Sequence, residues 1–398
     1  MPFKMVLKNT FLILLFSSFL SITSGKAQNK STNRDIIVGA QKIETYLPML
    51  IDKKVGVVAN QTSVIFKKEA HTHLIDSLIQ LKINIIKVFS PEHGFRGTYD
   101  AAEHVSNSTD PKTGLPIISL HGKHKKPTIP DLKNLDVILF DIQDVGVRFY
   151  TFLSTLHLVM EACSENNIPV ILLDRPNPNG HYIDGPTLKT KYSSFVGKHP
   201  VPLVYGMTIG EYADMINGEK WLKNETVCDL TIVPLTNYTH QKEYHLPIKP
   251  SPNLPNAVAI NLYPSLGFFE GTPINAGRGT NHQFQQYGSA KFPNSSFGYT
   301  PQSNKGSKNP KDKNKLCHGI TLKNTPRLNK INIKWLIDAY EKYPVKEKFF
   351  GATFTSHVGD TLLRHQLKEK YTAKQIEESW NKDLDKFKRI RAKYLLYP

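Results

Sequence analysis

The chain has 398 residues, which is long enough for a substantial core and usually for two domains. Hydrophobic residues make up 39% of it and charged residues 21%, so a disordered or fibrous protein is excluded. Lys and Arg outnumber Asp and Glu by 51 to 34, which gives a formal net charge of +17. This excess of positive charge is consistent with an anionic partner, either nucleic acid or an acidic surface. It is equally consistent with a basic protein surface that only aids solubility.

The first 27 residues have the layout of a secretory signal peptide. Lys4 and Lys8 precede an apolar run over 11–22, and Gly25 and Ala27 supply the small residues of a cleavage site. The run is short for a helix that must cross about 30 Å of hydrocarbon, and no cysteine follows it for lipid attachment. We therefore expect an exported protein, periplasmic or extracellular, with no integral membrane segment after the leader is removed. Export and the lack of an arginine-rich helix argue against nucleic acid and favour acidic cell-wall material as the partner.

The cysteines and histidines indicate neither a disulfide framework nor a metal site. Cys163, Cys228 and Cys317 are widely spaced and form no pairwise ligand motif. The closest histidine pairs, at 71 and 73 and at 121 and 124, are weak metal signals on their own. We expect inert buried thiols, no metal and no other cofactor.

After residue 54, short apolar segments alternate with amphipathic ones. The segments typical of strands are 54–59, 83–89, 115–120, 136–141, 168–174 and 227–235. The segments typical of helices are 71–81, 149–165 and 208–217. Because such alternation produces a mostly parallel sheet covered on both faces, we predict an α/β fold with a Rossmann-like domain over residues 28–249.

A cluster of prolines at 247, 250, 252 and 255 marks the expected boundary to a smaller α+β C-terminal domain, residues 250–398. In this domain we expect a strand at 320–322 and helices at 333–343 and 372–396. The segment 294–315 is rich in Asn, Ser, Lys, Gly and Pro and has little apolar surface to bury. We expect it to be a mobile loop, either a simple insertion or a lid over a site.

The ends of the expected strands are the first place to look for a site, because ligands of open α/β sheets bind beyond the carboxyl ends of the strands. Polar residues follow most of these strands: Asn60 and Gln61, Glu92 to Arg96, His121 and His124, Asp141 and Asp144, and Asp174 and Arg175. No glycine-rich phosphate-binding turn follows the first strand, and no Gly-x-Ser-x-Gly elbow occurs. A nucleotide cofactor and a serine nucleophile are therefore not supported.

Carboxylates are the remaining candidates for chemistry in the first domain. Glu92 lies in a tight turn after a strand, where a partly desolvated carboxyl can keep its proton near neutral pH, as a general acid must. Asp141 and Asp144 follow the fourth strand, with Arg148 and Tyr150 close behind. Each acid taken alone could instead cap a helix or form an ion pair.

In the second domain, Glu270 precedes a Gly-Arg-Gly turn whose Arg278 could bind a carboxylate with two hydrogen bonds. Asp174, next to Arg175, looks most like half of an ion pair. Taken together, the acids, tyrosines and arginines suggest a saccharide site, because glycosidases use two carboxyl groups that flank one bond.

Six motifs occur in a fixed order along the chain. They are Ser-Pro-Glu-His-Gly-Phe-Arg-Gly at 90–97, Phe-Asp-Ile-Gln-Asp-Val-Gly-Val-Arg-Phe-Tyr-Thr at 140–151, Asp-Arg-Pro-Asn-Pro at 174–178, Ser-Pro-Asn-Leu-Pro at 251–255, Phe-Glu-Gly-Thr at 269–272 and Gly-Arg-Gly-Thr at 277–280. In this order they resemble the exo-β-N-acetylmuramidase (NamZ) family over nearly the whole mature chain. The chain departs from the family pattern after Thr280, where His282-Gln-Phe284 replaces a Pro-Phe pair.

The resemblance implies an enzyme that hydrolyses the β-1,4 bond to N-acetylglucosamine and releases N-acetylmuramic acid from the non-reducing ends of peptidoglycan fragments. It also implies a site in the cleft between the two domains. Glu92 matches the leading catalytic candidate of the family, and Asp144 and Glu270 are candidates for its partner. The residues expected to bind substrate are His93, Arg96, Asp141, Arg148, Tyr150, Asp174, Arg175, Asn253 and Arg278.

The expected substrate sharpens these assignments. N-acetylmuramic acid carries a lactyl carboxylate, so one of Arg96, Arg148, Arg175 and Arg278 should face the sugar. We expect Glu92 to protonate the glycosidic oxygen, while an acidic partner or the acetamido group of the substrate acts at the anomeric carbon. The alternatives are a non-catalytic module that binds cell-wall saccharide, and an esterase or amidase, which would need a nucleophile or metal site that the sequence does not show.

Overall fold

The computed structural model describes Met1 and residues 35–67, 70–92, 94–96 and 108–398. Residues 36–398 form one compact unit, and the fold of this unit is described here. The expected signal peptide lies outside the described residues, apart from Met1. None of the helices in the described part of the chain is both long and apolar enough to cross a membrane.

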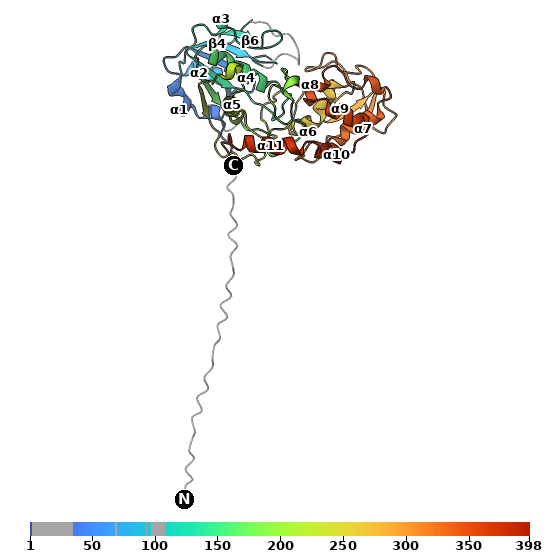
Figure 1. Ribbon diagram of the computed structural model, residues 1–398. Coiled ribbons are helices and arrows are strands. Elements are labelled where there is room, and N and C mark those ends of the chain that lie inside the picture. Colours follow the sequence, from blue (N-terminus) through green and yellow to red (C-terminus); the bar gives the residue numbers. More distant parts are fainter. Residues whose placement is uncertain (2–34, 68–69, 93, 97–107) are drawn as a thin grey trace. The chain divides into compact units, whose positions relative to one another are not determined.

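A seven-stranded sheet forms the first half of this unit (Figure 1). Its strands are β1 (Val55–Ala59), β4 (Ile85–Ser90), β5 (Ser108–Thr109), β6 (Pro116–Ser119), β7 (Val137–Asp141), β8 (Val170–Leu173) and β9 (Leu230–Val233). They lie in the order β5-β6-β4-β1-β7-β8-β9, and every neighbouring pair is parallel except β5 and β6. The predicted mostly parallel α/β sheet is therefore confirmed.

The central strands β1, β7 and β8 are buried along their whole length because helices cover both faces of the sheet there. The side chains of Val57, Leu139 and Ile171 point into one hydrophobic core. Their sequence neighbours Val58 and Phe140 point into the other core. This two-residue alternation, buried on both sides, is what parallel strands require.

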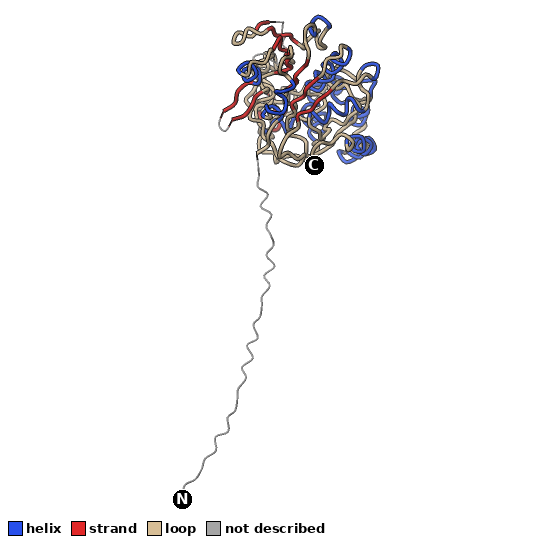
Figure 2. Tube along the Cα trace, turned by 90° about the vertical axis from the view of Figure 1, so that its left-hand side faces the viewer, coloured by secondary structure: helices blue, strands red, loops and turns tan. Residues whose placement is uncertain are grey.

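The helices of this half are short except for one. They are α1 (Ile43–Tyr46), α2 (Leu74–Gln80), α3 (Ile129–Leu132), α4 (Phe152–Glu165) and α5 (Ile209–Gly218). The first core contains α2 residues and the second contains α4 and α5 residues, so these helices cover opposite faces. Long loops connect many of these elements, as the tan tube in Figure 2 shows. The 3-10 helices of the unit are η1 (Gly39–Gln41), η2 (Leu47–Met49), η3 (Thr190–Tyr192), η4 (Lys223–Glu225), η5 (Gly267–Gly271) and η6 (Lys346–Lys348).

The prediction of a helix over 71–81 was wrong at its beginning. The chain first makes a two-stranded antiparallel ribbon from β2 (Val64–Lys67) and β3 (Ala70–His73). Helix α2 begins only after His73, whose ring Nδ1 accepts a hydrogen bond from the backbone of Ile75 at 3.3 Å. This cap satisfies a free N–H group at the helix start.

The second half is built from short helices and a small antiparallel sheet. Its helices are α6 (Ala257–Leu266), α7 (Lys334–Lys342), α8 (Phe354–Val358), α9 (Leu362–Lys368), α10 (Ala373–Glu378) and α11 (Asn381–Arg391). Its strands are β10 (Gln286–Ser289), β11 (Gly298–Tyr299) and β12 (Cys317–Thr321), in the order β10-β12-β11. The single helix expected over 372–396 is two helices, because the buried Trp380 lies at a break between α10 and α11.

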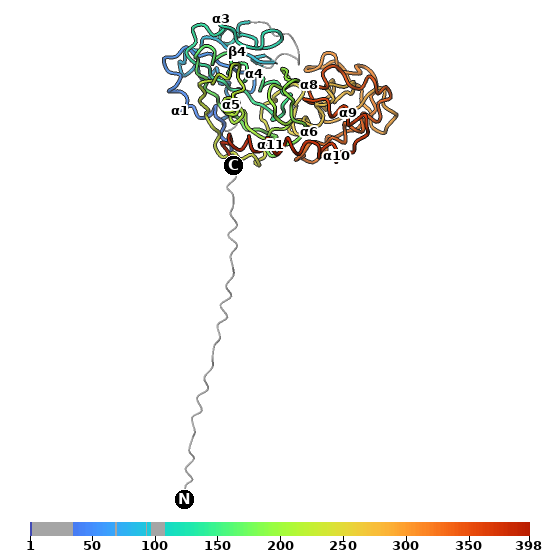
Figure 3. The backbone as a smooth tube through the Cα atoms, viewed as in Figure 1, coloured from blue at the N-terminus to red at the C-terminus, as the bar shows by residue number. Residues whose placement is uncertain are grey.

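The end of the chain returns to the first half, as the red tube in Figure 3 shows. Arg391, at the end of α11, donates to the carbonyl of Gly206 at 2.9 Å. The hydroxyl of Tyr397 donates to Asp174 at 2.7 Å and accepts from the backbone N–H of Leu235 at 2.8 Å. The last residues therefore complete the packing beside β8 and β9.

Candidate active site

The strand order reverses between β1 and β7, which places a topological switch point at the carboxyl ends of these two strands. From β1 the chain continues to β4 on one side, and from β7 it continues to β8 on the other side. Adjacent strands whose connections diverge in this way form the usual ligand site of an open α/β sheet. The last residues of the two strands, Ala59 and Asp141, are register partners, so their following loops meet.

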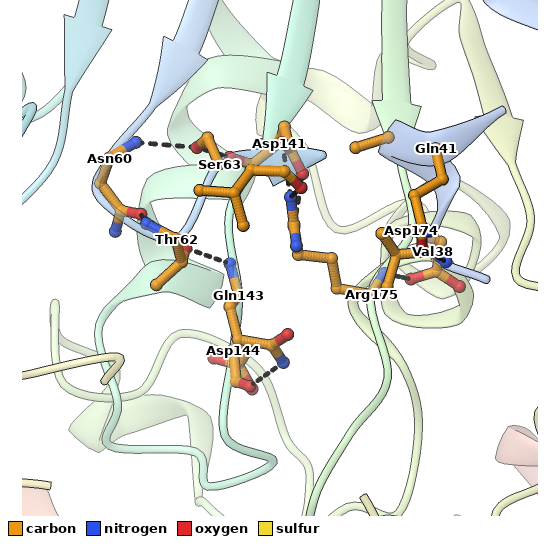
Figure 4. Close-up of polar contacts among 12 residues, drawn as sticks. Val38, Gln41, Asn60, Thr62, Ser63, Asp141, Gln143, Asp144, Asp174 and Arg175 are labelled. Carbon is orange, nitrogen blue, oxygen red and sulfur yellow. Dashed lines mark hydrogen bonds and ion pairs between the residues drawn. The ribbon is translucent and has the colours of Figure 1, made fainter. Parts of the chain in front are cut away.

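Hydrogen bonds join these two loops directly (Figure 4). The side chain of Thr62 accepts from the backbone N–H of Gln143 at 3.0 Å. Asn60 accepts from the backbone and the hydroxyl of Thr62 at 2.9 and 2.6 Å. Ser63 donates to the carbonyl of Asp141. The loop after β7, which carries Asp144, is therefore held in one position.

Asp144 is a buried carboxyl with one oxygen satisfied and one not. Its Oδ2 accepts from the hydroxyl of Tyr205 and from the N–H of Gly146, at 2.7 Å for the latter. Its Oδ1 is buried and has no hydrogen-bond partner among the described residues. Burial raises the pKa of Asp144 to about 6, although both hydrogen bonds act to lower it. This carboxyl can therefore hold a proton in mildly acidic solution.

Glu92 follows β4, the strand next to β1, and is half-buried. The hydroxyl of Thr151 donates to its Oε2 at 3.0 Å, so the loop before α4 fixes one carboxyl oxygen. The preceding residue, Tyr150, donates its hydroxyl to the carbonyl of Pro250 at 2.8 Å. His93, the neighbour of Glu92, lies outside the described residues.

Glu270 lies on η5 and forms a two-fold ion pair with Arg278. The distances are 3.0 Å from Nε to Oε1 and 3.1 Å from Nη2 to Oε2. Lys311 lies close by and donates to the carbonyl oxygens of Phe269 and Glu270 at 2.6 and 3.3 Å. Burial alone would raise the pKa of Glu270, but the charges of Arg278 and Lys311 outweigh it and lower the pKa to about 2. Glu270 is therefore a carboxylate at every physiological pH.

The hydroxyl of Tyr263, on α6, is influenced by the charges of all three carboxyl groups. Burial raises the pKa of its hydroxyl, and the charges of Glu270, Glu92 and Asp144 raise it further, while Arg278 lowers it. Its ring packs edge-on against the rings of Phe149, Tyr150 and Phe284, with centroid distances of 5.1, 6.1 and 4.8 Å. The three carboxyl groups expected to be catalytic thus lie within electrostatic range of one hydroxyl.

The four candidate arginines are in different situations. Arg96 pairs with Asp110 at 2.7 Å and Arg175 pairs with Asp141 at 2.5 Å. Arg148 is buried, and its guanidinium donates to four backbone carbonyls, those of Pro186, Val201, His357 and Val358. Its geometry favours a structural role over the substrate contact expected for it. The side chain of Arg278 is 23% exposed and pairs with Glu270, one of the three candidate carboxyl groups.

Three further residues expected to bind substrate hold the fold together in this structure. Asp141 is fully buried in its pair with Arg175. Asp174, also fully buried, accepts from Thr208, from the N–H of Gly210 at the start of α5, and from Tyr397. Asn253 donates to the carbonyl of Gly306 at 2.7 Å, and its Oδ1 is buried without a partner among the described residues.

The segment 294–315 contributes to the site instead of standing apart as a separate loop. Residues 298–299 pair with β12, and the side chain of Asn304 donates to the carbonyl of Thr280 at 3.2 Å. Asn275 donates to the carbonyl of Lys311 at 2.8 Å, which holds this lysine beside Glu270. Composition alone does not reveal this, because a lysine in a polar segment looks like a solvated one.

Sequence reasoning missed Thr151, Tyr263 and Lys311. Thr151 was part of a recognised motif, but no role was expected for it. Tyr263 lies in an apolar helix, where an aromatic residue usually signals core packing. Within the part of the chain that the structure describes, no group of three or more His, Cys, Asp or Glu side chains is arranged to hold a metal ion. The three cysteines are buried and free.

Comparison with known proteins identifies relatives along almost the whole chain. The family model described as "Exo-beta-N-acetylmuramidase NamZ, N-terminal" matches residues 55–258. The one described as "Exo-beta-N-acetylmuramidase NamZ, C-terminal" matches residues 261–397. The peptidoglycan β-N-acetylmuramidase NamZ of Bacillus subtilis (strain 168) is 35% identical over 95% of this chain and 97% of its own length.

Two solved structures of DUF1343 family proteins from Bacteroides fragilis NCTC 9343 share the fold. The first is 44% identical with a TM-score of 0.84, and covers 92% of this chain and 99% of its own. The second is 28% identical with a TM-score of 0.77, and covers 91% of this chain and 99% of its own.

Proposed function

Because the chain belongs to the exo-β-N-acetylmuramidase NamZ family, we propose that it is a peptidoglycan glycosidase that releases N-acetylmuramic acid from non-reducing chain ends. The bond cleaved is the β-1,4 bond to N-acetylglucosamine. The observation that carries the proposal is the match of both family domains along the chain, and the influence of Glu92, Asp144 and Glu270 on the pKa of one hydroxyl, that of Tyr263, supports it.

Glu92 is the general acid in this proposal. The residue is half-buried, and Thr151 orients its carboxyl through a hydrogen bond to Oε2. Glu270 is unsuited to this role, because a carboxyl with a pKa of about 2 has no proton to donate. Its fixed negative charge is suited to stabilising the positive charge that develops at the anomeric carbon.

Asp144 supports the second half of the reaction. Its unsatisfied Oδ1 is an acceptor in a buried place, and its position after β7 is fixed by Gly146 and Tyr205. We assign it to the acetamido N–H of the substrate, whose carbonyl oxygen would attack the anomeric carbon in the substrate-assisted route. In the two-carboxyl route, Asp144 or Glu270 acts directly on the sugar or on water.

Recognition of the lactyl carboxylate falls to Arg278 and Lys311. These two side chains carry two positive charges against the one negative charge of Glu270, so the cluster can accept a second carboxylate. Arg96, Arg148 and Arg175 have their guanidinium groups engaged by Asp110, by backbone carbonyls and by Asp141. We also propose that residues 1–27 direct export, which brings the enzyme to its peptidoglycan substrate.

The test is the release of a chromophore from an aryl β-N-acetylmuramic acid glycoside, with the matching β-N-acetylglucosaminide as control. We expect cleavage of the first and at most slow cleavage of the second, since only the first carries the lactyl carboxylate. Equal cleavage of both would overturn the assignment of Arg278 and Lys311. Cleavage of neither by the folded protein would overturn the proposed activity.

A further inference from the structure

A groove of about 630 Å³ lies beside the candidate active site, within the volume range of about 300–1,000 Å³ typical of small-molecule sites. We call it the amide groove. Apart from Ser251, its polar lining consists of Gln61, Lys249, Asn281, Gln283, Asn304 and Lys305, and prolines form much of the remainder. The mechanism proposed above uses none of these six residues.

One wall of the amide groove is linked by hydrogen bonds to the part of the site that carries Glu92. Gln61, which directly follows Asn60 at the end of β1, donates to the carbonyls of Lys249 and Pro250 at 3.3 and 3.1 Å. The same carbonyl of Pro250 accepts from the hydroxyl of Tyr150, the neighbour of the threonine that holds Glu92.

The opposite wall is linked to the part of the site that carries Arg278. Asn281 and Gln283 bracket the loop before Phe284, and the guanidinium of Arg278 lies over the Phe284 ring at 5.2 Å. Asn304, from the lysine-rich segment, is fixed to the same loop by its hydrogen bond to Thr280. The two walls of the groove are thus linked through hydrogen bonds and short loops to residues next to Glu92 and to Arg278.

The groove offers oriented acceptors. The amide nitrogens of Gln61 and Asn304 already donate to backbone carbonyls, which fixes the direction of both amide groups. The amide oxygens of these two side chains are buried and have no donor among the described residues. A buried acceptor without a donor is costly, so a ligand that supplies O–H or N–H groups gains by meeting it.

The charged side chains that line the groove are all positive. Lys249 and Lys305 are exposed lysines of its lining, and no acidic side chain is among the residues that line it, all of which are described. Hydroxyl and acetamido groups together with widely spaced carboxylates are the features of an aminosugar chain that contains muramic acid. A neutral or basic ligand would leave the two lysines uncompensated.

We propose that the amide groove binds the saccharide on the reducing side of the cleaved bond. This inference rests on the proposed function, since an exo-acting enzyme that encloses the terminal sugar must hold the rest of the chain outside that pocket. The amide side chains receive the hydroxyl and acetamido groups, and the lysines receive the lactyl carboxylate of the next muramic acid residue. Chain length beyond the terminal sugar therefore contributes to specificity.

The experiment compares an aryl β-N-acetylmuramic acid glycoside with the peptide-free tetrasaccharide in which N-acetylmuramic acid and N-acetylglucosamine alternate. The test variant is Asn281→Ala with Lys305→Ala, because both side chains are exposed in the lining and neither forms a side-chain hydrogen bond or ion pair with another described residue. The matched control is Lys323→Ala with Asn324→Ala, two exposed residues outside the groove. We expect kcat/KM for the tetrasaccharide to fall about tenfold in the test variant, while the aryl glycoside changes less than about twofold.

Three results would overturn the inference. The first is an equal loss on both substrates, and the second is no loss on either by an active enzyme. The third requires the same tetrasaccharide with stem peptides as an additional substrate: a loss confined to that substrate would make the peptide the occupant. Failure of the proposed function itself is distinct, because the unmodified enzyme would then not cleave the aryl glycoside at all.

Discussion

Two arginine–carboxylate ion pairs, one in each half of the protein, have similar geometry and different surroundings. In the parallel sheet, Arg175 and Asp141 meet through two hydrogen bonds of 2.5 and 2.8 Å, and their side chains are 2% and 0% exposed. In the second half, Arg278 and Glu270 also meet through two hydrogen bonds, and their side chains are 23% and 24% exposed. The first pair joins strand ends, whereas water and ligands can reach the second. The same pair of side-chain types thus serves the fold in one place and is suited to a substrate in the other.

The difference between the two ion pairs predicts that catalysis depends on side chains that a ligand can reach. Among these, we expect substitution of Glu92 to lower turnover the most. Glu92→Gln keeps the hydrogen bond from Thr151 and removes the acid proton, so turnover of the muramic acid glycoside should fall about 10²- to 10⁴-fold. The melting temperature should stay close to that of the unmodified protein. Glu225→Gln, an exposed glutamate on η4, is the control. A Glu92→Gln enzyme with substantial activity would remove Glu92 from the acid role.

The buried pair should show the largest effect on stability. Arg175→Met leaves the Asp141 carboxylate buried without its partner, so the free energy of unfolding should fall by about 3–5 kcal/mol. Urea unfolding measures this change. The double variant Asp141→Leu with Arg175→Met removes both charges and should recover part of the loss. If the single variant lost less than about 1 kcal/mol, the structural role of this pair would be wrong.

The open pair should show the opposite balance. Arg278→Met should cost less than about 1 kcal/mol of stability, because the pair is partly solvated. It should lower kcat/KM for the muramic acid glycoside about 10- to 100-fold, as expected for the loss of a charged hydrogen-bonding partner. Arg278→Lys should retain part of this activity, and Arg389→Met on α11 is a neutral control. Unchanged preference for the muramic acid glycoside over the glucosaminide would contradict a contact between Arg278 and the lactyl group.

Two buried or half-buried carboxyl groups, Asp174 in the first half and Glu270 in the second, should also respond to pH with opposite signs, which is the smallest effect. Burial raises the pKa of Asp174 to about 6 from 3.8, so its folded state binds a proton more tightly than its unfolded state. Its contribution to stability is full below about pH 3.8 and is lost as the pH rises to about 6. The pKa of Glu270 is lowered to about 2 from 4.5, so its contribution is present above pH 4.5 and is lost as the pH falls toward 2.

Melting temperatures measured over this pH range would test these signs. Asp174→Asn should flatten the decline between pH 4 and 6, and Glu270→Gln should flatten the decline below pH 4.5. A steeper decline in either variant would show that the sign assigned to that carboxyl is wrong. Asp144, which shares the raised pKa of about 6, keeps part of the first slope in the Asp174 variant.

The parallel sheet was predictable from the sequence because its strands are buried on both faces. Each central strand is a nearly continuous apolar run, as over 137–141, and such runs do not depend on distant partners to be recognised. The start of α2 was not predictable, because His71 to His73 pair with residues 64–66 in a ribbon that the spacing of later leucines does not indicate. Tertiary pairing there outweighs local periodicity.

The carboxyl groups of the candidate site were predictable because each follows a strand or lies in a distinctive motif. The partners of these groups were not. The four carbonyls around Arg148 come from segments about 40, 50 and 210 residues away, so the sequence near the arginine does not distinguish a structural guanidinium from a substrate-binding one. Lys311 reaches Glu270 across 41 residues of loops and strands for the same reason.

The return of the chain end to the first sheet bears on how the protein is made. Tyr397 supplies a donor to Asp174 and an acceptor to Leu235, and Leu396 donates to Glu211 at 2.9 Å, so residues 396–397 finish a core begun some 220 residues earlier in the sequence. During synthesis from the N-terminus, the sheet cannot reach its final packing while these residues are still inside the ribosome.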